Sequence, residues 1–420
     1  MSKKILVVGG GAAGMMAAIT AAEHGGEVSL LEPNERLGKK LNITGKGRCN
    51  VTNNAGSEEL LAHVAKNGRF LYSAFSRFDG RDTMRFFESL GVPLKTERGN
   101  RVFPVSDRSF DISGALEKRM RALHIQWIHD KADALLVNDG AVSGVAGEKQ
   151  KYEADAVILA TGGVSYPATG STGDGYRMAQ TVGHTLVPAV GSLVPLVSDD
   201  PCCAAMQGLA LKNIQLTVHN QKKKVIYQDF GELLFTHFGL SGPLILSASA
   251  HLQDFEKNSY TLSIDLKPAL DEKKLEARIL RDMDEKKNQN FSSLVAGLVA
   301  HSMIPVVVER CGVDGETKVN SVTREARKAL EMVLKQFTVP VTGKRPVEEA
   351  IVTSGGVKVG EINPNTMESK LVKRLYFAGE ILDVDAYTGG FNLQIAWATG
   401  RAAGEAAAAE ENKSKGSEAT

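Results

Sequence analysis

The chain of 420 residues lacks the cysteine patterns of a zinc site or a disulfide framework. Its four cysteines are Cys49, Cys202, Cys203 and Cys311, and no two of them are spaced as C-x-x-C. It also lacks an apolar run as long as a membrane span, and its N-terminus has no apolar stretch followed by a cleavage site. These absences predict a cytoplasmic protein with reduced thiols, no bound metal and no membrane contact.

An excess of charge of either sign is missing as well. Fifty Lys and Arg residues face forty-nine Asp and Glu residues, which leaves a formal charge of +1. No overall field therefore draws the protein to nucleic acid or to a membrane surface. Residues 66–121 are a local exception with a basic excess, which either steers an anionic substrate or is a solvated basic face.

What the sequence has is a βαβ unit at its start. Residues 5–8 form a short apolar run typical of a buried parallel strand, residues 12–24 favour a helix, and residues 28–31 form a second strand. The turn between strand and helix carries Gly9, Gly11 and Gly14, the G-x-G-x-x-G pattern. These glycines allow a tight turn, close approach of a pyrophosphate and close packing of helix on strand, so a dinucleotide site is expected here.

An acid at the end of the second strand supports this interpretation. Glu32 lies at the distance along the chain at which a carboxylate accepts hydrogen bonds from the ribose hydroxyls of an adenosine, and Pro33 follows it. Both FAD and NAD bind to such a unit, so the motif alone leaves the two cofactors open.

The next segment, residues 33–53, is rich in Gly, Asn and Thr and carries Lys40 and Arg48, so we expect a long functional loop that wraps a diphosphate. Cys49 is either a reactive thiolate beside Arg48 or a buried packing residue.

The run T-G-K-G-R-C-N-V-T-N resembles the S-G-G-G-R-C-N-x-T-N signature of a bacterial FAD-binding flavoprotein family, known as NAD(FAD)-utilising dehydrogenases or aminoacetone-oxidase-like enzymes. The family-like stretches continue over nearly the whole chain.

Two later turns are predicted to complete the cofactor site. A buried strand at residues 154–160 ends in Thr161 and Gly162, at the sheet edge where ligands of open α/β sheets bind. Asp174 is placed to cap the helix that begins at Tyr176. Near the C-terminus a strand ends in Gly379 and Glu380, and Gly390 precedes a helix from about residue 392 to residue 408. The N-terminus of that helix would stabilise negative charge on a reduced flavin, which favours FAD over NAD.

The resemblance and these motifs together give the candidate FAD-binding residues. They are Gly9, Gly11, Ala13, Gly14, Glu32, Pro33, Lys40, Thr44, Gly45, Arg48, Cys49, Asn50, Thr161, Gly162, Gly379, Glu380, Gly390, Asn392 and Leu393. There is no second G-x-G-x-x-G in a strand–helix context, so NAD(P)H either binds transiently as electron donor or is replaced by another donor.

The predicted fold class is α/β, with a Rossmann-like FAD-binding domain of the glutathione-reductase type interrupted by an inserted β-barrel-like plus helical module. We assign residues 1–192 and 356–408 to the FAD-binding domain and residues 193–355 to the insert. Within the insert, residues 193–266 alternate as antiparallel β structure, with a hairpin whose tip is Lys222 to Lys224, and residues 267–340 are helical. Pro243 suits the first turn of a helix. Residues 409–420 form a polar tail.

The expected activity is that of an FAD-dependent oxidoreductase in which hydride moves through flavin N5. No acid–base pair is recognisable from spacing, and Cys49, His237 and Tyr387 are the catalytic candidates; His237 is either a proton donor or a hydrogen-bonded structural histidine. The resemblance implies two substrate classes, uridine of large-subunit ribosomal RNA reduced with NAD(P)H and small amines oxidised with release of peroxide. A flavin-binding sensor without turnover is the non-enzymatic alternative.

Overall fold

The computed structural model describes residues 2–252 and 254–409, and these form two compact units. The first unit combines the two ends of the chain, up to Ser192 and again from Val347. The second unit is the unbroken segment Leu193–Pro346. Each unit has its own hydrophobic core, so the two are described separately.

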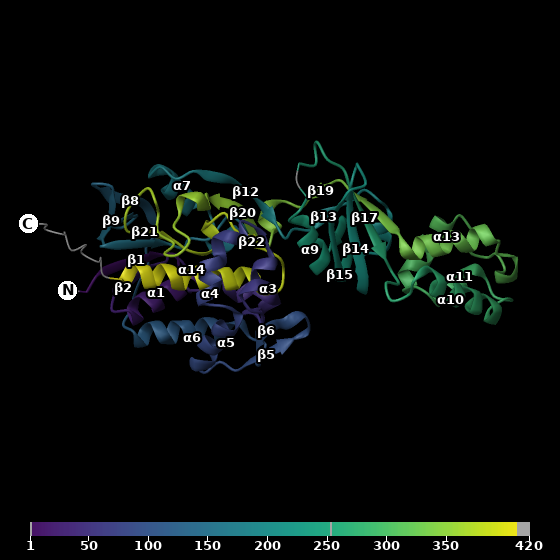
Figure 1. The fold of residues 1–420 in the computed structure, drawn as a ribbon, viewed down its shortest axis with the longest axis horizontal. Helices are drawn as coiled ribbons and strands as arrows, with labels where there is room; N and C mark the ends of the chain where they lie inside the picture. The colour runs from purple at the N-terminus through teal and green to yellow at the C-terminus, as the bar shows by residue number, and fades with distance from the viewer. Residues whose placement is uncertain (1, 253, 410–420) are drawn as a thin grey trace, which may run out of the picture. The chain divides into compact units, whose positions relative to one another are not determined.

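A five-stranded parallel sheet is the centre of the first unit (Figure 1). Its order is β21 (Leu375–Phe377), β11 (Ala156–Leu159), β1 (Lys4–Val8), β2 (Glu27–Leu31) and β7 (Gln126–Ile128). The middle strand β1 pairs with β2 and β11, so its apolar residues are buried on both faces of the sheet. The late strand β21 joins this sheet beside β11, which brings the C-terminal segment to the N-terminal motif.

Two helices far apart in the sequence pack against each other on this sheet. The N-terminal helix α1 (Ala12–Glu23) contacts the C-terminal helix α14 (Phe391–Ala408) along its length. A Cβ on Gly400 would lie 2.4 Å from the carbonyl oxygen of Ala13, so only glycine permits this approach of the two backbones. Small residues therefore set the distance between the first and the last helix of the unit.

The remaining elements of the first unit are short helices, 3-10 turns and small antiparallel sheets. They are α2 (Lys39–Ile43), η1 (Thr44–Gly47), β3 (Thr52–Asn53), α3 (Ser57–Ala62), β4 (Val64–Lys66), η2 (Gly68–Leu71), α4 (Tyr72–Arg77), α5 (Gly80–Ser89), β5 (Leu94–Glu97), η3 (Arg98–Asn100), β6 (Arg101–Pro104), α6 (Ser109–Ala122), β8 (Ala132–Asn138), β9 (Ala141–Gly147), β10 (Lys151–Glu153), η4 (Pro167–Thr169), α7 (Asp174–Thr181), β12 (Leu186–Ser192), η7 (Val347–Glu349), β20 (Val352–Val357), η8 (Val359–Glu361), η9 (Gly379–Ile381) and β22 (Asp385–Ala386).

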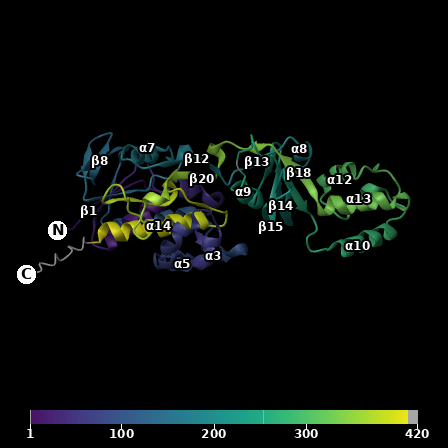
Figure 2. The ribbon, with the colours of Figure 1, turned by 45° about the horizontal axis from the view of Figure 1, so that its top comes forward.

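The second unit combines a seven-stranded sheet with a group of helices (Figure 2). The strands β18 (Phe337–Val341), β17 (Tyr260–Asp265), β14 (Ala210–Asn220), β15 (Val225–Thr236), β16 (Gly239–Ser241), β13 (Leu196–Val197) and β19 (Gly343–Lys344) pair antiparallel in that order. The helical elements are α8 (Cys202–Ala205), α9 (Pro243–Ser249), α10 (Glu272–Glu285), α11 (Phe291–Ala296), η5 (His301–Met303), α12 (Ile304–Cys311), η6 (Val319–Ser321) and α13 (Arg324–Lys335). The predicted hairpin near residue 221 is β14–β15, and Pro243 begins α9 as expected.

Several local predictions differ from the structure. The segment 347–355 belongs to the first unit rather than to the insert, because β20 pairs with β12. The expected loop 33–53 contains the short helix α2, and residues 337–341 are a strand rather than part of the helical stretch. Asp174 does not cap α7, whose cap residue is Gly173; its carboxylate pairs with Lys131 instead. The predicted tail lies, from residue 410, outside the described residues.

None of the helices in the described ranges combines the length and the apolar character that a membrane crossing requires.

Candidate functional site

The glycine turn between β1 and α1 leaves open space beside the helix N-terminus. Gly9 has φ +105°, and a Cβ there would lie 2.5 Å from the oxygen of Ala160. A Cβ on Gly14 would lie 1.8 Å from the oxygen of Gly9, whereas a Cβ on Gly11 would meet no atom within 4 Å. No side chain caps α1, so the N–H groups of its first turn are free to bind an anion in that space.

The carboxylate at the end of β2 holds this turn. Glu32 is buried, its Oε2 accepts a hydrogen bond from the backbone N–H of Gly10 at 2.7 Å, and its Oε1 accepts from the N–H of Asn34 at 2.9 Å. Pro33, which stands between Glu32 and Asn34 in the chain, is exposed. The same Oε1 also accepts from the side-chain N–H of Asn34 at 2.7 Å. A carboxylate has about four lone-pair sites, so one of them is left for a ribose hydroxyl group.

The turn after β11 contributes a buried polar atom. Thr161 and Gly162 follow this strand, and a Cβ on Gly9 would lie 3.1 Å from the Cα of Thr161. The hydroxyl of Thr161 is buried and has no hydrogen-bond partner among the described residues. Buried polar groups are nearly always hydrogen-bonded, so this atom fits a site that a polar ligand completes.

A polar network joins the late glycine–acid turn to the early part of the chain. Glu380 forms an ion pair with Lys40, with Nζ and Oε2 2.6 Å apart. The hydroxyl of Ser165 donates to Glu380 Oε1 at 3.0 Å, and the backbone N–H of Thr353 donates to the same oxygen at 2.8 Å. A Cβ on the neighbouring Gly379 would lie 2.7 Å from the Cβ of Ala13. The predicted residues of both chain ends thus meet at one place.

Ser165 and Thr353 are functional candidates that the sequence reasoning missed. The hydroxyl oxygen of Thr353 accepts hydrogen bonds from the N–H groups of Val164 and Ser165. The sequence signal for Ser165 is its position two residues after A-T-G-G, and the signal for Thr353 is its position directly before S-G-G.

Arg48 is engaged away from this network. Its guanidinium bonds to Glu97 and to Asp107, with nearest N···O distances of 2.5 Å in both cases, and lies over the ring of Phe103. Its acid partners lie on or next to the β5–β6 hairpin. The structure therefore gives Arg48 a role in fixing that hairpin, which the sequence did not predict.

Cys49 is a packing residue and not a thiolate. Its side chain is fully buried, and burial raises the pKa of the thiol to about 12, with a bond to Thr44 acting in the opposite direction. Its backbone has φ +58°, as does that of Gly45 in the same turn. The hypothesis of a reactive thiolate is therefore wrong, because the thiol stays protonated at neutral pH.

The helix α14 of the same unit begins with backbone N–H groups that no side chain caps. Gly390 has φ +98° and its Cβ would lie 2.4 Å from the backbone of Thr52, so the turn requires glycine. No side chain caps α14, and the first-turn N–H groups, including those of Asn392 and Leu393, are free. The Asn392 side chain instead accepts from the N–H of Ala386 at 3.0 Å and donates to its oxygen at 2.7 Å, which closes the preceding loop.

Buried contacts of α14 tie this turn to the signature segment. Trp397 is fully buried, and its Nε1 donates to the oxygen of Val51 at 2.8 Å. With its amide oxygen facing α14, Asn50 accepts from the N–H of Gly390 at 3.0 Å. The side chain of Gln394 accepts from the hydroxyls of Thr52 and Thr83. The family-like run around Cys49 is therefore packed directly on the start of α14.

Two buried acids occupy the loop before α14. Asp383 forms an ion pair with Lys66 at 2.7 Å. Asp385 is 2% exposed, its Oδ2 accepts from the hydroxyl of Ser192 at 2.7 Å, and its Oδ1 is buried without a hydrogen-bond partner among the described residues. Burial raises the pKa of Asp385 above its usual range, and the nearby Asp383 acts in the same direction. Asp385 is therefore the strongest acid–base candidate of this loop.

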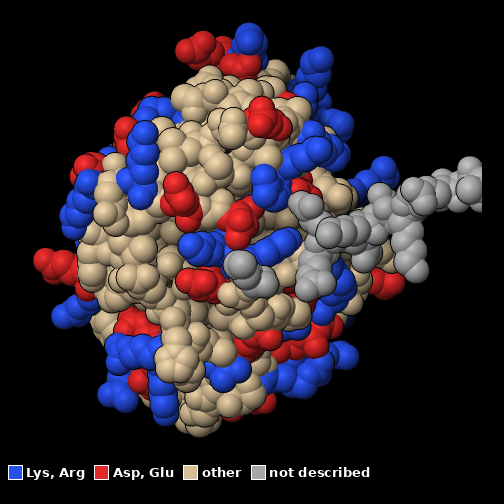
Figure 3. All heavy atoms as spheres, turned by 90° about the vertical axis from the view of Figure 1, so that its left-hand side faces the viewer, with Lys and Arg blue, Asp and Glu red and all other residues tan. Residues whose placement is uncertain are grey.

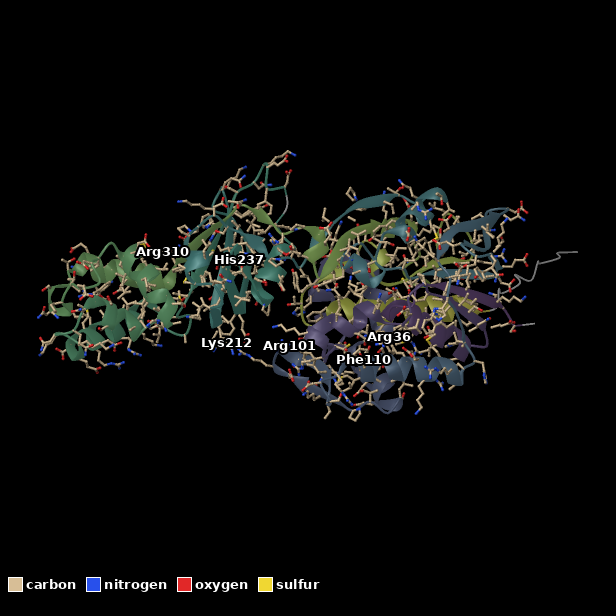
Figure 4. The ribbon with its side chains drawn as sticks, turned by 180° about the vertical axis from the view of Figure 1, so that it is seen from behind. Arg36, Arg101, Phe110, Lys212, His237 and Arg310 are labelled. Atoms are coloured by element: carbon tan, nitrogen blue, oxygen red, sulfur yellow. The ribbon has the colours of Figure 1, made fainter. Side chains whose placement is uncertain are left out.

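The other catalytic candidates have different surroundings. His237 belongs to the second unit (Figure 4), where it is exposed in the turn after β15 and packs edge-on against Phe238. Its ring makes no hydrogen bond to a described residue, so the interpretation as a hydrogen-bonded structural histidine is wrong. Tyr387 lies in the loop before α14, and its N–H donates to the oxygen of His63 at 3.0 Å.

The basic excess of residues 66–121 is largely balanced within the first unit. Lys66, Arg77 and Arg119 form ion pairs with acids outside the segment, at Asp383, Glu405 and Glu23. On the face of the first unit that Figure 3 shows, basic and acidic side chains are interspersed. The segment resembles a solvated, ion-paired surface more than a steering field.

Comparison with known proteins gives a match over almost the whole chain. Residues 3–406 match the family model described as HI0933-like protein Rossmann domain. The 3-dehydro-bile acid delta(4,6)-reductase of Clostridium scindens is 32% identical over 96% of this chain and 99% of its own length. The ribosomal RNA dihydrouridine synthase of Escherichia coli is 28% identical over 94% of this chain and 95% of its own.

A solved structure agrees at the level of the fold. The 3-ketosteroid-delta4-(5alpha)-dehydrogenase of Rhodococcus jostii RHA1 covers 97% of both chains with a TM-score of 0.52, at 16% identity. Together with the glycine turns and the acid of β2, the family match supports FAD as the cofactor that the site is built to hold.

Proposed function

The chain belongs to the HI0933-like Rossmann-domain family and is an FAD-dependent oxidoreductase, and from this premise we propose that it reduces a carbon–carbon double bond conjugated to a carbonyl group. Two relatives that span nearly the whole chain support the proposal. One is named as a reductase of a 3-dehydro-bile acid and one as a dihydrouridine synthase, and both names denote saturation of such a bond. Reduced nicotinamide is the proposed electron source.

The roles of the protein groups follow from their positions. The free N–H groups of α1 would bind the pyrophosphate, and Glu32 would bind the ribose. The N-terminus of α14 would face the electron-rich edge of the flavin ring. Bound FAD would supply the hydride chemistry that links the nicotinamide donor to one carbon of the double bond. The other carbon needs a proton, and overall NAD(P)H and one proton are consumed while NAD(P)+ is released.

Asp385 carries this proposal, because it is a buried carboxyl group with one oxygen that has no hydrogen-bond partner among the described residues, and burial raises its pKa above the usual range. In this proposal its Oδ1 or Oδ2 holds the proton for the second carbon, either directly or through a water molecule. The neighbouring Asp383 is engaged differently, in an ion pair with Lys66 at 2.7 Å.

The substrate to test first is uridine in large-subunit ribosomal RNA, and a 3-oxo steroid acid with a ring double bond is the second. The test begins with anaerobic addition of NADPH or NADH to the yellow holoprotein, followed by each substrate. Rapid bleaching, slow reoxidation in air and a product with two additional hydrogens are expected. Peroxide formed from an amine without nicotinamide would instead identify an amine oxidase, and a flavin that no donor reduces would identify a sensor; either result contradicts the proposal.

Replacing Asp385 with asparagine should change how stability depends on pH. A folded-state pKa above the unfolded value of 3.8 means that the native state binds the proton more tightly, so this contribution is complete below the unfolded pKa and is lost as the pH rises through the folded pKa. As the pH rises from below 3.8 through the folded-state pKa, the melting temperature of the wild type should therefore fall relative to that of Asp385→Asn. Parallel melting curves that keep a constant spacing would contradict the assigned direction.

A further inference from the structure

A hollow on the first unit lies between α3, η2 and α4. It has a volume of about 730 Å³ and is lined by Glu58, Leu61, Ala62, Gly68, Arg69 and Tyr72. This volume is within the range of small-molecule sites in proteins, about 300–1,000 Å³. The hollow is open to solvent, so it also admits one part of a larger ligand.

The lining combines an unshielded aromatic ring with an unpaired cation. Tyr72 is 65% exposed, so its ring is not part of the core and is accessible for a ligand ring to stack on it. The side chains of Arg69 and Glu58 form no ion pair with a described residue, whereas the neighbouring Lys66 and Arg77 pair with Asp383 and Glu405. Arg69 therefore keeps its donors for an external anion.

The walls of the hollow are fastened to the loop that precedes α14. Directly after α3, the ring of His63 stacks on Phe391 with centroids 4.3 Å apart, and the His63 oxygen accepts from the N–H of Tyr387. The strand β4 then pairs with β22, which contains Asp385. Directly before η2, Asn67 donates to the oxygen of Asp383 at 2.6 Å. A ligand in the hollow would thus rest on segments that position the candidate acid.

We propose that this hollow is a substrate subsite for a flat ring system that carries an acidic group, with the ring against Tyr72 and the anion on Arg69. Glu58 accepts a hydrogen bond from an N–H or O–H group of the same ligand. This inference rests on the proposed function, and its chemistry is shared by the two substrate candidates. A uridine nucleotide offers a planar base with a phosphate, and a steroid acid offers fused rings with a carboxylate.

The test compares variants of the hollow with matched variants on other surfaces of the first unit. Tyr72→Ala and Arg69→Gln remove the ring and the charge, and Arg69→Lys retains the charge. Phe110→Ala removes a similarly exposed aromatic ring on α6 (Figure 4), and Arg81→Gln removes an exposed arginine on α5. The two probes are a short uridine-containing oligoribonucleotide and a 3-oxo steroid carboxylic acid, titrated into the holoprotein at two salt concentrations.

We expect Tyr72→Ala and Arg69→Gln to weaken binding of one probe at least tenfold and to raise its KM with little change in kcat. Arg69→Gln should also reduce the salt dependence, Arg69→Lys should restore part of the affinity, and the two control variants should stay within twofold of the wild type. The probe that responds identifies the source of the ligand. Nicotinamide should reduce the flavin equally fast in all variants.

Unchanged affinity and KM in Tyr72→Ala and Arg69→Gln, or a wild type that binds neither probe, would overturn the subsite. These results are distinguishable from failure of the proposed function, which shows in the wild type as an absence of double-bond reduction. Binding measured without turnover still decides whether the hollow is a ligand site.

Discussion

Gly11→Ala is expected to leave the apoprotein folded and to weaken FAD binding at least 100-fold, about 2.8 kcal/mol. The new Cβ would meet no protein atom within 4 Å, and the ordinary backbone conformation at this position, with φ −80°, accepts alanine. The space it would fill is the space beside the free N–H groups of α1, where the pyrophosphate is proposed to lie. The measurements are the melting temperature of the apoprotein and a fluorescence titration with FAD.

The matched variant is Gly14→Ala, in which the Cβ would lie 1.8 Å from the oxygen of Gly9. This variant should lower the melting temperature of the apoprotein itself, since helix and turn have to separate. The pair distinguishes space reserved for a ligand from space filled by the protein. Wild-type FAD affinity in Gly11→Ala would show that the pyrophosphate binds elsewhere.

Trp397→Ala should destabilise the first unit by about 4 kcal/mol, the usual cost of removing a fully buried large aromatic side chain. The deletion leaves a cavity in α14 and leaves the oxygen of Val51 without its donor. Trp397→Phe keeps one aromatic ring but loses that hydrogen bond and part of the buried ring volume, so a smaller loss of about 2 kcal/mol is expected.

Urea-induced release of FAD, followed by flavin fluorescence, reports on the first unit alone. We expect the midpoints to fall in the order wild type, Trp397→Phe, Trp397→Ala. If the phenylalanine variant were as unstable as the alanine variant, the hydrogen bond to Val51 and not the packing would dominate. Equal midpoints for all three would contradict the role of this contact.

The parts of the fold that were predictable are those whose causes are local in the sequence. The strand–glycine–helix–strand unit is encoded within about thirty residues, and each of its elements forms within one or two residues of the expected bounds. The same holds for the β14–β15 hairpin and for the proline that starts α9. The family-like run around Cys49 and the late glycine turn were also correctly placed in one unit, because motif resemblance carries information that periodicity does not.

The parts that were missed depend on partners far away in the chain. Lys40 meets Glu380 across 340 residues, and Arg48 finds Glu97 and Asp107 on or next to a hairpin whose position no local pattern reveals. The helix α2 is too short to form alone and is held by hydroxyl groups of α6 that bond to Asn42. Asp385 was passed over because its sequence neighbours do not show that it is buried.

The hydroxyl partner of Asp385 also links two regions of the fold. Ser192 is the last residue of β12 and the last residue before the second unit begins. Ser192 therefore stands where the chain leaves the first unit and also donates a hydrogen bond to Asp385. A substitution such as Ser192→Ala would remove that hydrogen bond.

The pairing of β21 with β11 has a consequence for biosynthesis. Until residues 375–408 have been made, the first unit has neither β21 nor α14, so β11 remains an open sheet edge and α1 lacks the helix α14 that packs along it. The second unit, encoded without interruption, has all its strands by then. A nascent chain that stalls late should consequently be a target for chaperones and prone to self-association, although most of it has already been synthesised.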